Sequence, residues 1–455
     1  MGQTDEKVYG LSKARLESIF DGGTFVEIGA YTKRADSQAD FESVVCGYGA
    51  VEGRLAFAFI QDSGRTKGAF GERHAKKIAA LYELAVKNGA PIIGVFDSAG
   101  AVIYDGAQAL AAYGKLMKKI SDASGIIPQI AVIDGVCGGS SAVAASMFDF
   151  VVTVKDHSKL YVNPPFVVGE TKPAVARGLS AYEAQDEASA FGFVRELIAI
   201  LPQNNADASY TDSADDLNRT VSVDVETDAA EALVGAIADD GKFTRLYADY
   251  TDTALLGFAS FGGVLTGVIA SQPAKKGILT IGTARAAAKL ISFCDSFGIP
   301  VLTLVNSEGL EVTVEAENAA YASELARLAY AYTTSENAKV TVVVGKAYGA
   351  AFTLLGSKSV GADIVFALPT ACVSVLSPEA SVAFVWNDKV GERSREELEA
   401  EWKETCGSAR EAVDAGEIDD IVEPSELRKR VCAAIGMLSA KADGIPTRKH
   451  ANLPL

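Results

Sequence analysis

Histidine is scarce in this sequence: the chain of 455 residues contains only His74, His157 and His450. The three share no spacing typical of metal ligands, and the sequence lacks a G-x-S-x-G nucleophile elbow. Zinc chemistry and hydrolysis by a Ser–His–Asp triad are therefore not predicted. If the chain is an enzyme, its chemistry does not rest on a cluster of histidines.

Paired cysteines and long apolar runs are also missing. The six cysteines lie far apart and none forms a C-x-x-C pair, which predicts buried free thiols in a reducing cytosol. The first ten residues, MGQTDEKVYG, contain no apolar signal core, and no apolar run is long enough to cross a membrane. Together these absences predict a cytoplasmic protein.

Positive charge is in short supply as well. The sequence has 42 Lys and Arg against 59 Asp and Glu, a formal net charge of −17. Such an excess repels polyanions, so we expect no nucleic-acid partner, although a local basic patch could hold a phosphate. The stretch RTKGAFGERHAKK (65–77), which includes Lys67 and Arg73, is such a patch. It could clamp phosphates at the mouth of a site or form the solvated start of a helix, and the sequence leaves both interpretations open.

The length of the chain predicts two domains, and an internal repeat supports this prediction. Short β-rich runs alternate with helical patterns, as is typical of α/β layers. KKIAALYELAVKNGAPIIGVFDSAG (76–100) resembles RAAAKLISFCDSFGIPVLTLVNSEG (285–309). The positions that match at one constant offset are Gly89 and Gly298, Pro91 and Pro300, Ser98 and Ser307, and Gly100 and Gly309. We expect domains at 1–215 and 216–455, joined in the Asn-, Asp- and Ser-rich stretch 202–220.

In each half, an apolar strand turns into a helix through small residues, at Gly138-Gly139 in the first half and Gly349-Ala350 in the second. Backbone N–H groups left open at such a turn can stabilise a developing oxyanion. Small residues also allow tight packing of a helix on a strand, and a single copy would favour that explanation. Two copies at equivalent places favour a function.

Further segments mark the whole chain. They are ARLESIFDGGTFVEIGAY (14–31), GYGAVEGR (47–54), APIIGVFDSAGA (90–101), GVCGG (135–139), ELIAILPQNN (196–205), SFCDSFGIPVLTLV (292–305), KAYGAAF (346–352), GADIVFALPTA (361–371) and EIDDIVEP (417–424). In this order and spacing the chain resembles the carboxyltransferase subunits of biotin-dependent acyl-CoA carboxylases and decarboxylases, which are relatives of crotonase. The resemblance implies an α/β fold of two tandem crotonase-like ββα-superhelix domains, the first on the acyl-CoA side and the second on the biotin side.

The resemblance also implies a reaction that needs no side-chain base. A carboxyl group moves between carboxybiotin on a carrier subunit and the α-carbon of a short acyl-CoA, while backbone amides hold the thioester enolate and the ureido oxygen. On the family's motifs these amides fall on Gly139 and Ser140 for the thioester and on Gly349, Ala350 and Ala351 for biotin. The other implied positions are Ser98, Ala99, Gly100, Ala101, Gly138, Lys67 and Arg73 for CoA, and Ser307, Gly309 and Thr353 for a biotin or acyl pocket. No metal is implied.

The implied partners follow from the same resemblance. The chain contains no A-M-K-M biotinylation motif, so biotin would be on a separate biotin carboxyl carrier protein. A biotin carboxylase or a sodium-pump membrane subunit would complete the system, and the second would place this chain at the periphery of a membrane complex. The family also implies a homo-oligomer, a hexamer, with active sites between the N half of one copy and the C half of another.

Two stretches and one further residue depart from the family pattern. The usual S-G-G-A-R-I-Q-E-G is SAGAVIYDG (98–106), the usual D-x-P-G-F is NSEGL (306–310), and a common acidic residue is Thr353. These changes keep the backbone donors but motivate two alternatives. The chain could be a non-catalytic assembly or regulatory paralogue. It could also catalyse another crotonase-type reaction, such as malonate-decarboxylase-like transfer, or a hydration for which Asp97 or Asp105 would supply the carboxylate.

Overall fold

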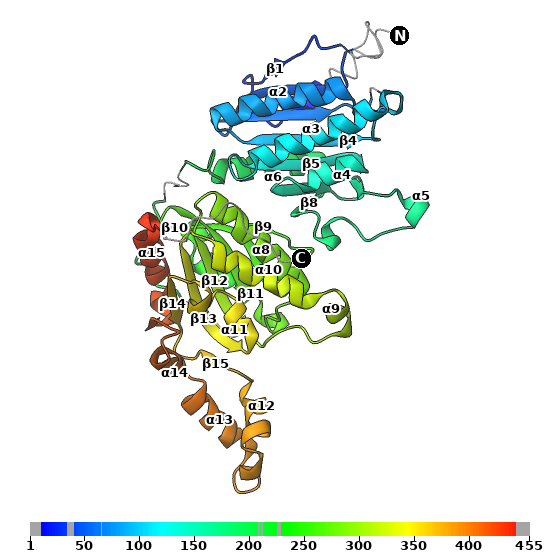
Figure 1. Ribbon diagram of the computed structural model, residues 1–455. Helices are drawn as coiled ribbons and strands as arrows, with labels where there is room; N and C mark the ends of the chain where they lie inside the picture. Colours follow the sequence, from blue (N-terminus) through cyan, green and yellow to red (C-terminus); the bar gives the residue numbers. More distant parts are fainter. Residues whose placement is uncertain are drawn as a thin grey trace. The chain divides into compact units, whose positions relative to one another are not determined.

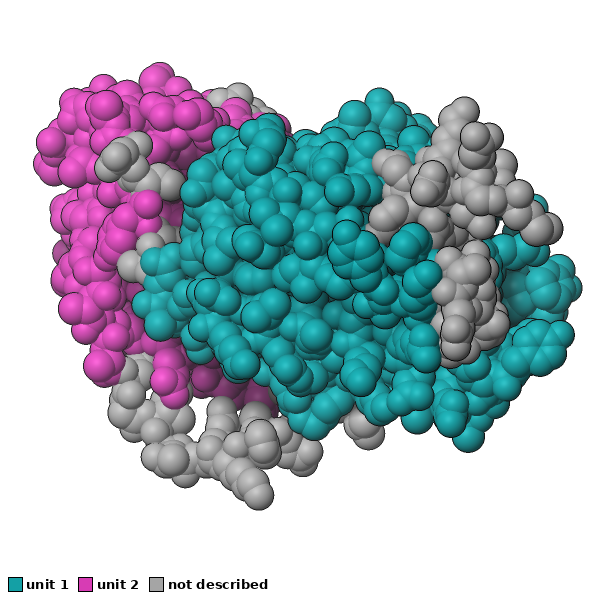
Figure 2. Space-filling view, turned by 90° about the horizontal axis from the view of Figure 1, so that it is seen from above, with its two compact units in different colours: residues 1–208 teal, residues 209–455 magenta. Residues whose placement is uncertain are grey.

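The computed structural model describes residues 11–33, 41–64, 66–207, 210, 213–224 and 229–442. The chain divides into two compact units, Met1–Ala208 and Ser209–Leu455, called unit 1 and unit 2 below and coloured separately in Figure 2. The division lies inside the linker stretch 202–220. Arg65 of the basic stretch, linker residues 208, 209, 211 and 212, and the outer ends of both expected domains lie outside the described residues.

Unit 1 is built on an eight-stranded sheet in the order β1-β2-β3-β4-β5-β6-β8, with β7 paired to β5 (Figure 1). The pairings β1–β2 and β2–β3 are antiparallel, and those from β3 onward are parallel. Its strands are β1 (Val26–Ile28), β2 (Val44–Val51), β3 (Arg54–Gln61), β4 (Ile92–Ser98), β5 (Gln129–Gly138), β6 (Phe150–Val154), β7 (Lys159–Tyr161) and β8 (Tyr182–Ala184). Its labelled α-helices are α2 (Glu72–Asn88), α3 (Ala107–Ala123), α4 (Ser140–Ser146), α5 (Pro165–Val168) and α6 (Glu187–Ile200).

Unit 2 repeats this arrangement. Its sheet has the order β9-β10-β11-β12-β13-β14-β16, with β15 paired to β13. Its strands are β9 (Thr244–Leu246), β10 (Ala254–Phe261), β11 (Val264–Ser271), β12 (Val301–Ser307), β13 (Lys339–Tyr348), β14 (Ile364–Ala367), β15 (Cys372–Ser374) and β16 (Asp420–Ile421). Its helices are α7 (Ala230–Ile237), α8 (Ile281–Ser296), α9 (Val314–Asn318), α10 (Tyr321–Thr334), α11 (Ala350–Leu354), α12 (Pro378–Val385), α13 (Arg395–Cys406), α14 (Ala409–Asp414) and α15 (Leu427–Met437). The α/β architecture and the internal repeat are confirmed.

Each unit has its own apolar core. In unit 1, helices α2, α3 and α4 pack on the sheet around fully buried aromatic side chains that include Phe59 and Phe96, whose rings meet edge to face with centroids 5.5 Å apart. In unit 2, α7 and α15 pack around strand residues such as Leu302 and Val342. Burial of such side chains contributes roughly 1.5–3 kcal/mol each. The cores therefore hold the sheets whose strand ends carry the site.

Local sequence explains where most elements begin and end. Strands β2 and β3 form a hairpin that turns at Glu52-Gly53. Helix α2 ends at Gly89, which adopts the left-handed conformation and donates its amide to the carbonyls of the last turn. The charged stretch 395–417 forms two helices because Ser408 accepts a hydrogen bond from the Glu411 amide and starts α14 anew.

An Asp–Arg clasp holds the β2–β3 turn of unit 1. The carboxylate of Asp21 accepts the backbone amides of Glu52 (3.2 Å) and Gly53 (2.8 Å). Arg195 of α6 donates to Asp21 at 2.9 Å and to the carbonyl of Ile19 at 2.9 Å. The clasp therefore joins the hairpin, the segment before it and the last helix of the unit.

Unit 2 holds its β10–β11 turn in the same way. Asp239 accepts the amides of Gly262 (3.0 Å) and Gly263 (2.7 Å), and Arg428 of α15 donates to Asp239 at 2.7 Å and to the carbonyl of Ile237 at 2.6 Å. The repeat thus extends from the strands to a specific polar contact. The sequence analysis did not predict either clasp.

The structure also shows how far the cysteines are buried and how long the apolar helices are. All six cysteines are free thiols; five are buried as predicted, and the prediction is wrong for Cys406, which is exposed at the end of α13. No helix within the described part of the chain is long and apolar enough to cross a membrane. Within the same residues, no group of three or more His, Cys, Asp or Glu side chains is arranged to hold a metal ion.

Candidate active site

In unit 1, the site expected for the thioester lies where β4 and β5 end side by side. The strands are parallel, and Ser98 at the end of β4 pairs with Cys137 near the end of β5. Gly139 then turns the chain into α4 with φ 59° and ψ −127°, a conformation that a residue with a Cβ rarely adopts. Its amide donates to the carbonyl of Tyr161 in β7 at 3.0 Å.

The end of β13 in unit 2 has the same backbone arrangement. Ser307 of β12 pairs with Ala347 of β13, and Gly349 turns the chain into α11 with φ 58° and ψ −147°. The Gly349 amide donates to the carbonyl of Ser374 in β15 at 2.9 Å. Both turns are therefore tied to the short strand that pairs with the end of the central strand.

These hydrogen bonds change which amides remain open. Gly139 and Gly349 were expected among the donors, but in the structure their amides are engaged with Tyr161 and Ser374. The next amides in the chain, those of Ser140 and Ala350, have no backbone acceptor among the described residues, as is usual in the first turn of a helix. They are the open donors at the two turns.

A second open amide lies on the neighbouring strand-end loop of each unit. In unit 1, the Phe70 amide donates to the Gly100 carbonyl (2.8 Å) and the Val102 amide to the Phe70 carbonyl (2.9 Å), so the Ala101 amide between them points the other way. Ala101 is three residues past Ser98, just as Ser140 is three past its pairing partner Cys137. Equal distances along paired parallel strands bring the two amides to the same edge.

The equivalent residue in unit 2 is Leu310. Leu279 donates to the Gly309 carbonyl at 3.0 Å and Glu311 to the Leu279 carbonyl at 3.3 Å, which leaves the Leu310 amide between them. The sequence analysis named Ala101 but missed Leu310. The offset that relates Gly100 to Gly309 also relates Ala101 to Leu310, so the repeat itself carried the signal.

The other predicted CoA residues of unit 1 gather at this strand end, with one exception. Ser98 accepts the Gly100 amide on its hydroxyl (3.2 Å), and the Ala99 amide donates to the carbonyl of Lys67 (2.9 Å). Gly138 faces the ring of Tyr161, where a Cβ would come within 2.9 Å of the ring. The exception is Arg73, which lies on α2 beside a separate cavity.

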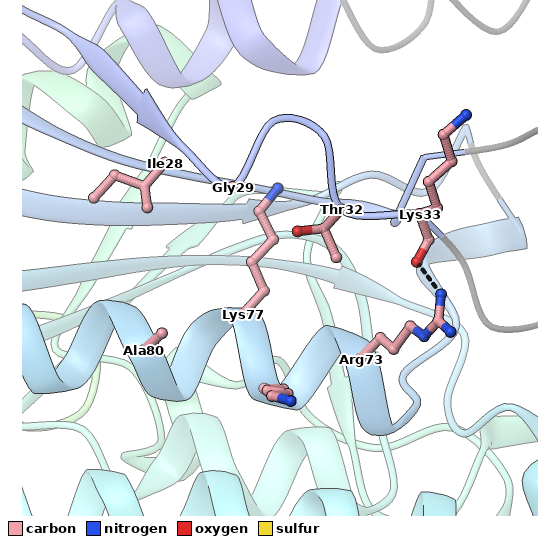
Figure 3. Close-up of a pocket in the computed structure, with 8 residues that line it drawn as sticks. Ile28, Gly29, Thr32, Lys33, Arg73, Lys77 and Ala80 are labelled. Atoms are coloured by element: carbon pink, nitrogen blue, oxygen red, sulfur yellow. Dashed lines mark hydrogen bonds between the residues drawn. The ribbon is translucent and has the colours of Figure 1, made fainter. Parts of the chain in front are cut away.

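That cavity, about 410 Å³ in volume, is lined by α2 and by the segment after β1 (Figure 3). Its lining consists of Ile28, Gly29, Thr32, Lys33, Arg73, Lys76, Lys77 and Ala80, and none of these eight described residues is acidic. Arg73 donates to the Lys33 carbonyl at 2.8 Å, and the buried Lys77 donates to the Val44 carbonyl at 2.7 Å. Four cationic side chains therefore share one hollow in an acidic protein. Lys67 is not among them.

Of the three predicted pocket residues of unit 2, Ser307 and Gly309 lie together and Thr353 lies apart. Ser307 accepts the Gly309 amide at 3.2 Å, which reproduces the Ser98–Gly100 contact of unit 1. Thr353 lies in α11, one turn beyond Ala350, and is exposed; its carbonyl accepts the Ser357 hydroxyl at 3.1 Å. Thr353 thus sits at the end of the short helix and not at the strand ends.

In unit 1, a contact between two hydroxyl groups supports the first turn of α4. Tyr113 of α3 lies 2.9 Å from the fully buried hydroxyl of Ser141, and its ring stacks on Phe70 with a centroid distance of 4.4 Å. Burial raises the pKa of Tyr113, so the phenol is neutral near pH 7 and can donate. At the equivalent position in unit 2, Ala351 offers no hydroxyl.

Of the two aspartates considered for carboxylate chemistry, Asp97 has a structural partner: it accepts the Val136 amide at 3.1 Å. Asp105 lies in the turn before α3, where its carboxylate comes within 2.8 Å of the place that a Cβ on Gly71 would occupy. A further aspartate, Asp134 inside β5, is almost fully buried between Arg15, with which it forms an ion pair, and His157, at 3.3 Å. The contacts of Asp97 and Asp134 give both carboxylates a structural role.

Comparisons with known proteins show the family of this chain. A family model described as carboxyl transferase domain matches residues 10–453. The propionyl-CoA carboxylase, carboxyltransferase subunit of Haloferax mediterranei is 31% identical, and the methylmalonyl-CoA decarboxylase subunit alpha of Propionigenium modestum is 34% identical. Each alignment covers 98% of this chain and 93% of the relative.

Solved structures give the same result for the fold. A transcarboxylase 12S crystal structure, described as a hexamer assembly with methylmalonyl-coenzyme A and methylmalonic acid bound, matches with a TM-score of 0.92 and 28% identity, covering 100% of this chain and 95% of that chain. A single-chain, multi-domain long-chain acyl-CoA carboxylase matches 95% of this chain with a TM-score of 0.80 at 21% identity, which supports the fold alone. Because the family model spans nearly the whole chain, this protein belongs to the carboxyl transferase domain family.

Proposed function

We propose that this chain is the carboxyltransferase subunit of a biotin-dependent acyl-CoA carboxylase or decarboxylase. Its substrate would be a short acyl-CoA of the propionyl/methylmalonyl or acetyl/malonyl type. The observation that carries the proposal is the paired arrangement at Gly139 and Gly349: in a chain of this family, each unit anchors a glycine amide and leaves the next amide open.

In unit 1, the amides of Ala101 and Ser140 would hold the thioester oxygen. When the α-proton leaves, negative charge builds up on that oxygen, and two fixed N–H donors stabilise it without any side-chain base. Removal of one such donor costs roughly a hundred- to a thousandfold in rate in well-studied enzymes. A reaction that relies on backbone donors and needs no side-chain base agrees with a sequence that has only three histidines.

In unit 2, the amides of Leu310 and Ala350 would hold the ureido oxygen of biotin. The site suits a flat polar group because Gly349 has no side chain, and a Cβ there would come within 3.3 Å of the Val375 carbonyl. When bound, carboxylated biotin on its separate carrier supplies the carboxyl group and the nitrogen that accepts the α-proton. Ala351, also named from the motif, is fully buried and would support the turn.

The basic cavity of unit 1 would bind the phosphates of CoA. Arg73 and Lys76 are exposed on one side of α2, and Lys33 reaches the same hollow from the segment after β1. Such contacts are formed equally with substrate and transition state, so they affect binding more than turnover. Replacement of Arg73 or Lys76 by Ala is expected to raise KM for acyl-CoA about tenfold with little change in kcat. The matched control is Lys118→Ala on α3, which should leave KM unchanged.

Assembly into a homo-oligomer, a hexamer, completes the proposal. Both units expose large apolar side chains next to the strands that anchor the glycine amides: Phe166 is 89% exposed after β7, and Val375 is 84% exposed after β15. The neighbouring residues Val167 and Leu376 are 66% and 42% exposed, and contiguous exposed apolar groups commonly mark contacts between subunits. A biotin carboxyl carrier protein, and a biotin carboxylase or a membrane pump subunit, would be the other partners.

The direct test is transfer of the carboxyl group. The purified chain is supplied with carboxybiotin and with acetyl-CoA, propionyl-CoA or butyryl-CoA, and the carboxylated thioester is measured. We expect acyl-CoA-dependent transfer with at least one of the three. Absence of transfer with every short acyl-CoA would contradict the proposal.

A second candidate is a non-catalytic member of the family. The stretch 98–106, which departs from the family motif, exposes Ile103 (87%) and Tyr104 (101%) next to the donor loop. Tight binding of an acyl-CoA, measured by calorimetry, with no turnover in the transfer assay would favour this candidate.

A further inference from the structure

A second charged cavity lies in unit 2, at the end of β13 that leads into Gly349. Its volume is about 270 Å³. The residues that line it are Pro273, Lys276, Asn306, Glu308, Gly345, Lys346, Tyr348, Thr370, Cys372 and Lys403. None of these ten is among the predicted site residues, although Asn306 and Glu308 lie in the NSEGL stretch that departs from the family motif and Lys346 and Tyr348 in the KAYGAAF segment.

A glutamate holds two of the three lysines. Glu308 accepts Lys346 at 2.8 Å on one carboxylate oxygen and Lys276 at 3.2 Å on the other. Partial burial pushes the pKa of Glu308 upward, but the hydrogen bonds from Lys346 and Lys276 outweigh it, so the pKa lies below its ordinary value. The carboxylate is therefore ionised and fixes both ammonium groups.

Hydrogen bonds from two backbone amides hold the segments of Glu308, Lys276 and Lys346 together. The Glu308 amide donates to the Lys276 carbonyl at 2.9 Å, and the Lys346 amide donates to the Asn306 side chain at 3.0 Å. Because Asn306 accepts through Oδ1, its Nδ2 group remains a donor at the cavity wall. Three separate segments thus converge on one small hollow.

The other polar groups of the lining add no negative charge. Burial raises the pKa of the Cys372 thiol and of the Tyr348 phenol, so both stay protonated near pH 7. Lys403, from α13, is the third cation, and no acceptor for it is present among the described residues. Glu379, outside the lining, also acts on Cys372 and Tyr348 through its charge. Three lysines therefore face one carboxylate in the lining and a second one nearby, and the balance stays positive.

Unit 1 has the same backbone at this place without the charges of Glu308 and Lys346. The repeat relates these residues to Ala99 and Val136, and the Asp97 side chain accepts the Val136 amide just as Asn306 accepts that of Lys346. Lys276 keeps its counterpart, Lys67, whose carbonyl also accepts the matching amide. The Glu308–Lys346 pair is thus not required by the fold, which favours a ligand as its reason.

We propose that this cavity binds a small carboxylate anion, with Lys403 as its direct cationic ligand and with Lys346 and the Asn306 amide as further donors. Charge-assisted hydrogen bonds of this kind are the strong ones in proteins. The position of the cavity, directly before Gly349, would place the bound anion beside the proposed biotin amides. Its role as the site of the transferred carboxyl group rests on the proposed function, but its binding of an anion does not.

The two tryptophans of the chain allow a binding test without turnover. Trp402 precedes Lys403 in α13 and packs on Trp386 with a ring-centroid distance of 4.9 Å. The full chain is titrated with malonate, with bicarbonate and with sulfate at constant ionic strength, and tryptophan fluorescence is recorded. We expect a saturable change with malonate or bicarbonate, and the comparison of these two distinguishes an organic carboxylate from hydrated CO₂.

Variants decide whether the cavity is the site. Lys403→Ala is expected to raise the apparent Kd about tenfold or more, because a hydrogen bond to a charged group is lost. Glu308→Gln is expected to tighten binding, because it removes the negative charge from the lining. The matched control is Lys389→Ala. Lys389 lies between α12 and α13, over the ring of Trp386 and outside the cavity, so its replacement should leave Kd unchanged.

Three outcomes would overturn the inference. They are a linear response to malonate and bicarbonate, equal binding of sulfate, and an unchanged Kd in Lys403→Ala. Because the titration contains no acyl-CoA and no biotin, its failure leaves the proposed transfer activity standing. Equally, an inactive chain that still binds malonate would contradict only the proposed function.

Discussion

The two Asp–Arg clasps have the same hydrogen bonds in different surroundings. In unit 1, the side chains of Asp21 and Arg195 are 29% and 26% exposed; in unit 2, those of Asp239 and Arg428 are 5% and 0% exposed. Water screens an exposed pair, so the pair adds little stability, whereas removal of one partner of a buried pair strands a charge. A repeated contact therefore need not contribute equally in both copies.

The largest effect is expected at Arg428. Arg428→Met leaves Asp239 buried without its counter-charge, and we expect unit 2 to lose about 3–5 kcal/mol of unfolding free energy. Urea denaturation followed by tryptophan fluorescence reports on unit 2, since Trp386 and Trp402 both lie there. Arg195→Met is the matched change in unit 1, followed by circular dichroism, and should cost much less. Equal losses would show that burial does not distinguish the clasps.

Substitution by proline tests whether the open amides of Ser140 and Ala350 each stabilise an oxyanion. Ser140→Pro and Ala350→Pro each delete one N–H at the first helical position, where the proline ring is tolerated. We expect kcat for carboxyl transfer to fall about a hundred- to a thousandfold in either variant. Ser140→Ala and Ala350→Ser keep the N–H and should stay near the wild-type rate. A proline variant with full activity would remove its unit from the proposed pair of sites.

The smallest effect concerns acid stability of unit 2. A hydrogen bond from Arg219, together with the Asp240 amide and the charge of Arg428, lowers the pKa of Asp215 to about 2. A carboxyl whose folded pKa is depressed stabilises the fold above its unfolded pKa of about 4, and this contribution is lost as the pH falls toward 2. Asp215→Asn should flatten the acid transition in that window, measured by tryptophan fluorescence. Asp216→Asn is the control, and an identical profile for both variants would contradict the assignment.

Much of the fold could be predicted because the repeat is carried by residues with strict local requirements. Gly89, Pro91 and Ser98 recur at one offset, and each ends or begins an element in the structure. Helix α2 was equally visible, since its apolar residues share one face and Gly89 stops it. The family followed from motifs spread over both halves.

The site was predicted less completely, because its decisive contacts join residues that are distant in sequence. The Gly139 amide is engaged by Tyr161, a residue of a three-residue strand that has no sequence signal of its own. Lys33 joins Arg73 only through the folding of the segment after β1. Arg428 stands next to Lys429 and Arg430 in the stretch SELRKRV, and the sequence does not distinguish the three cations, yet the structure buries Arg428 completely and exposes the side chains of the other two.

The anchored amides of Gly139 and Gly349 have a consequence for the energetics of the reaction. Each glycine is fixed to a neighbouring strand by its own hydrogen bond, so the direction of the following N–H is set when the chain folds. In water, dipoles must reorient around a developing charge; in the proposed reaction the N–H groups of Ser140 and Ala350 would need no such reorientation. The cost of solvating the transition state would then be part of the folding free energy, where the apolar cores of the two units offset it.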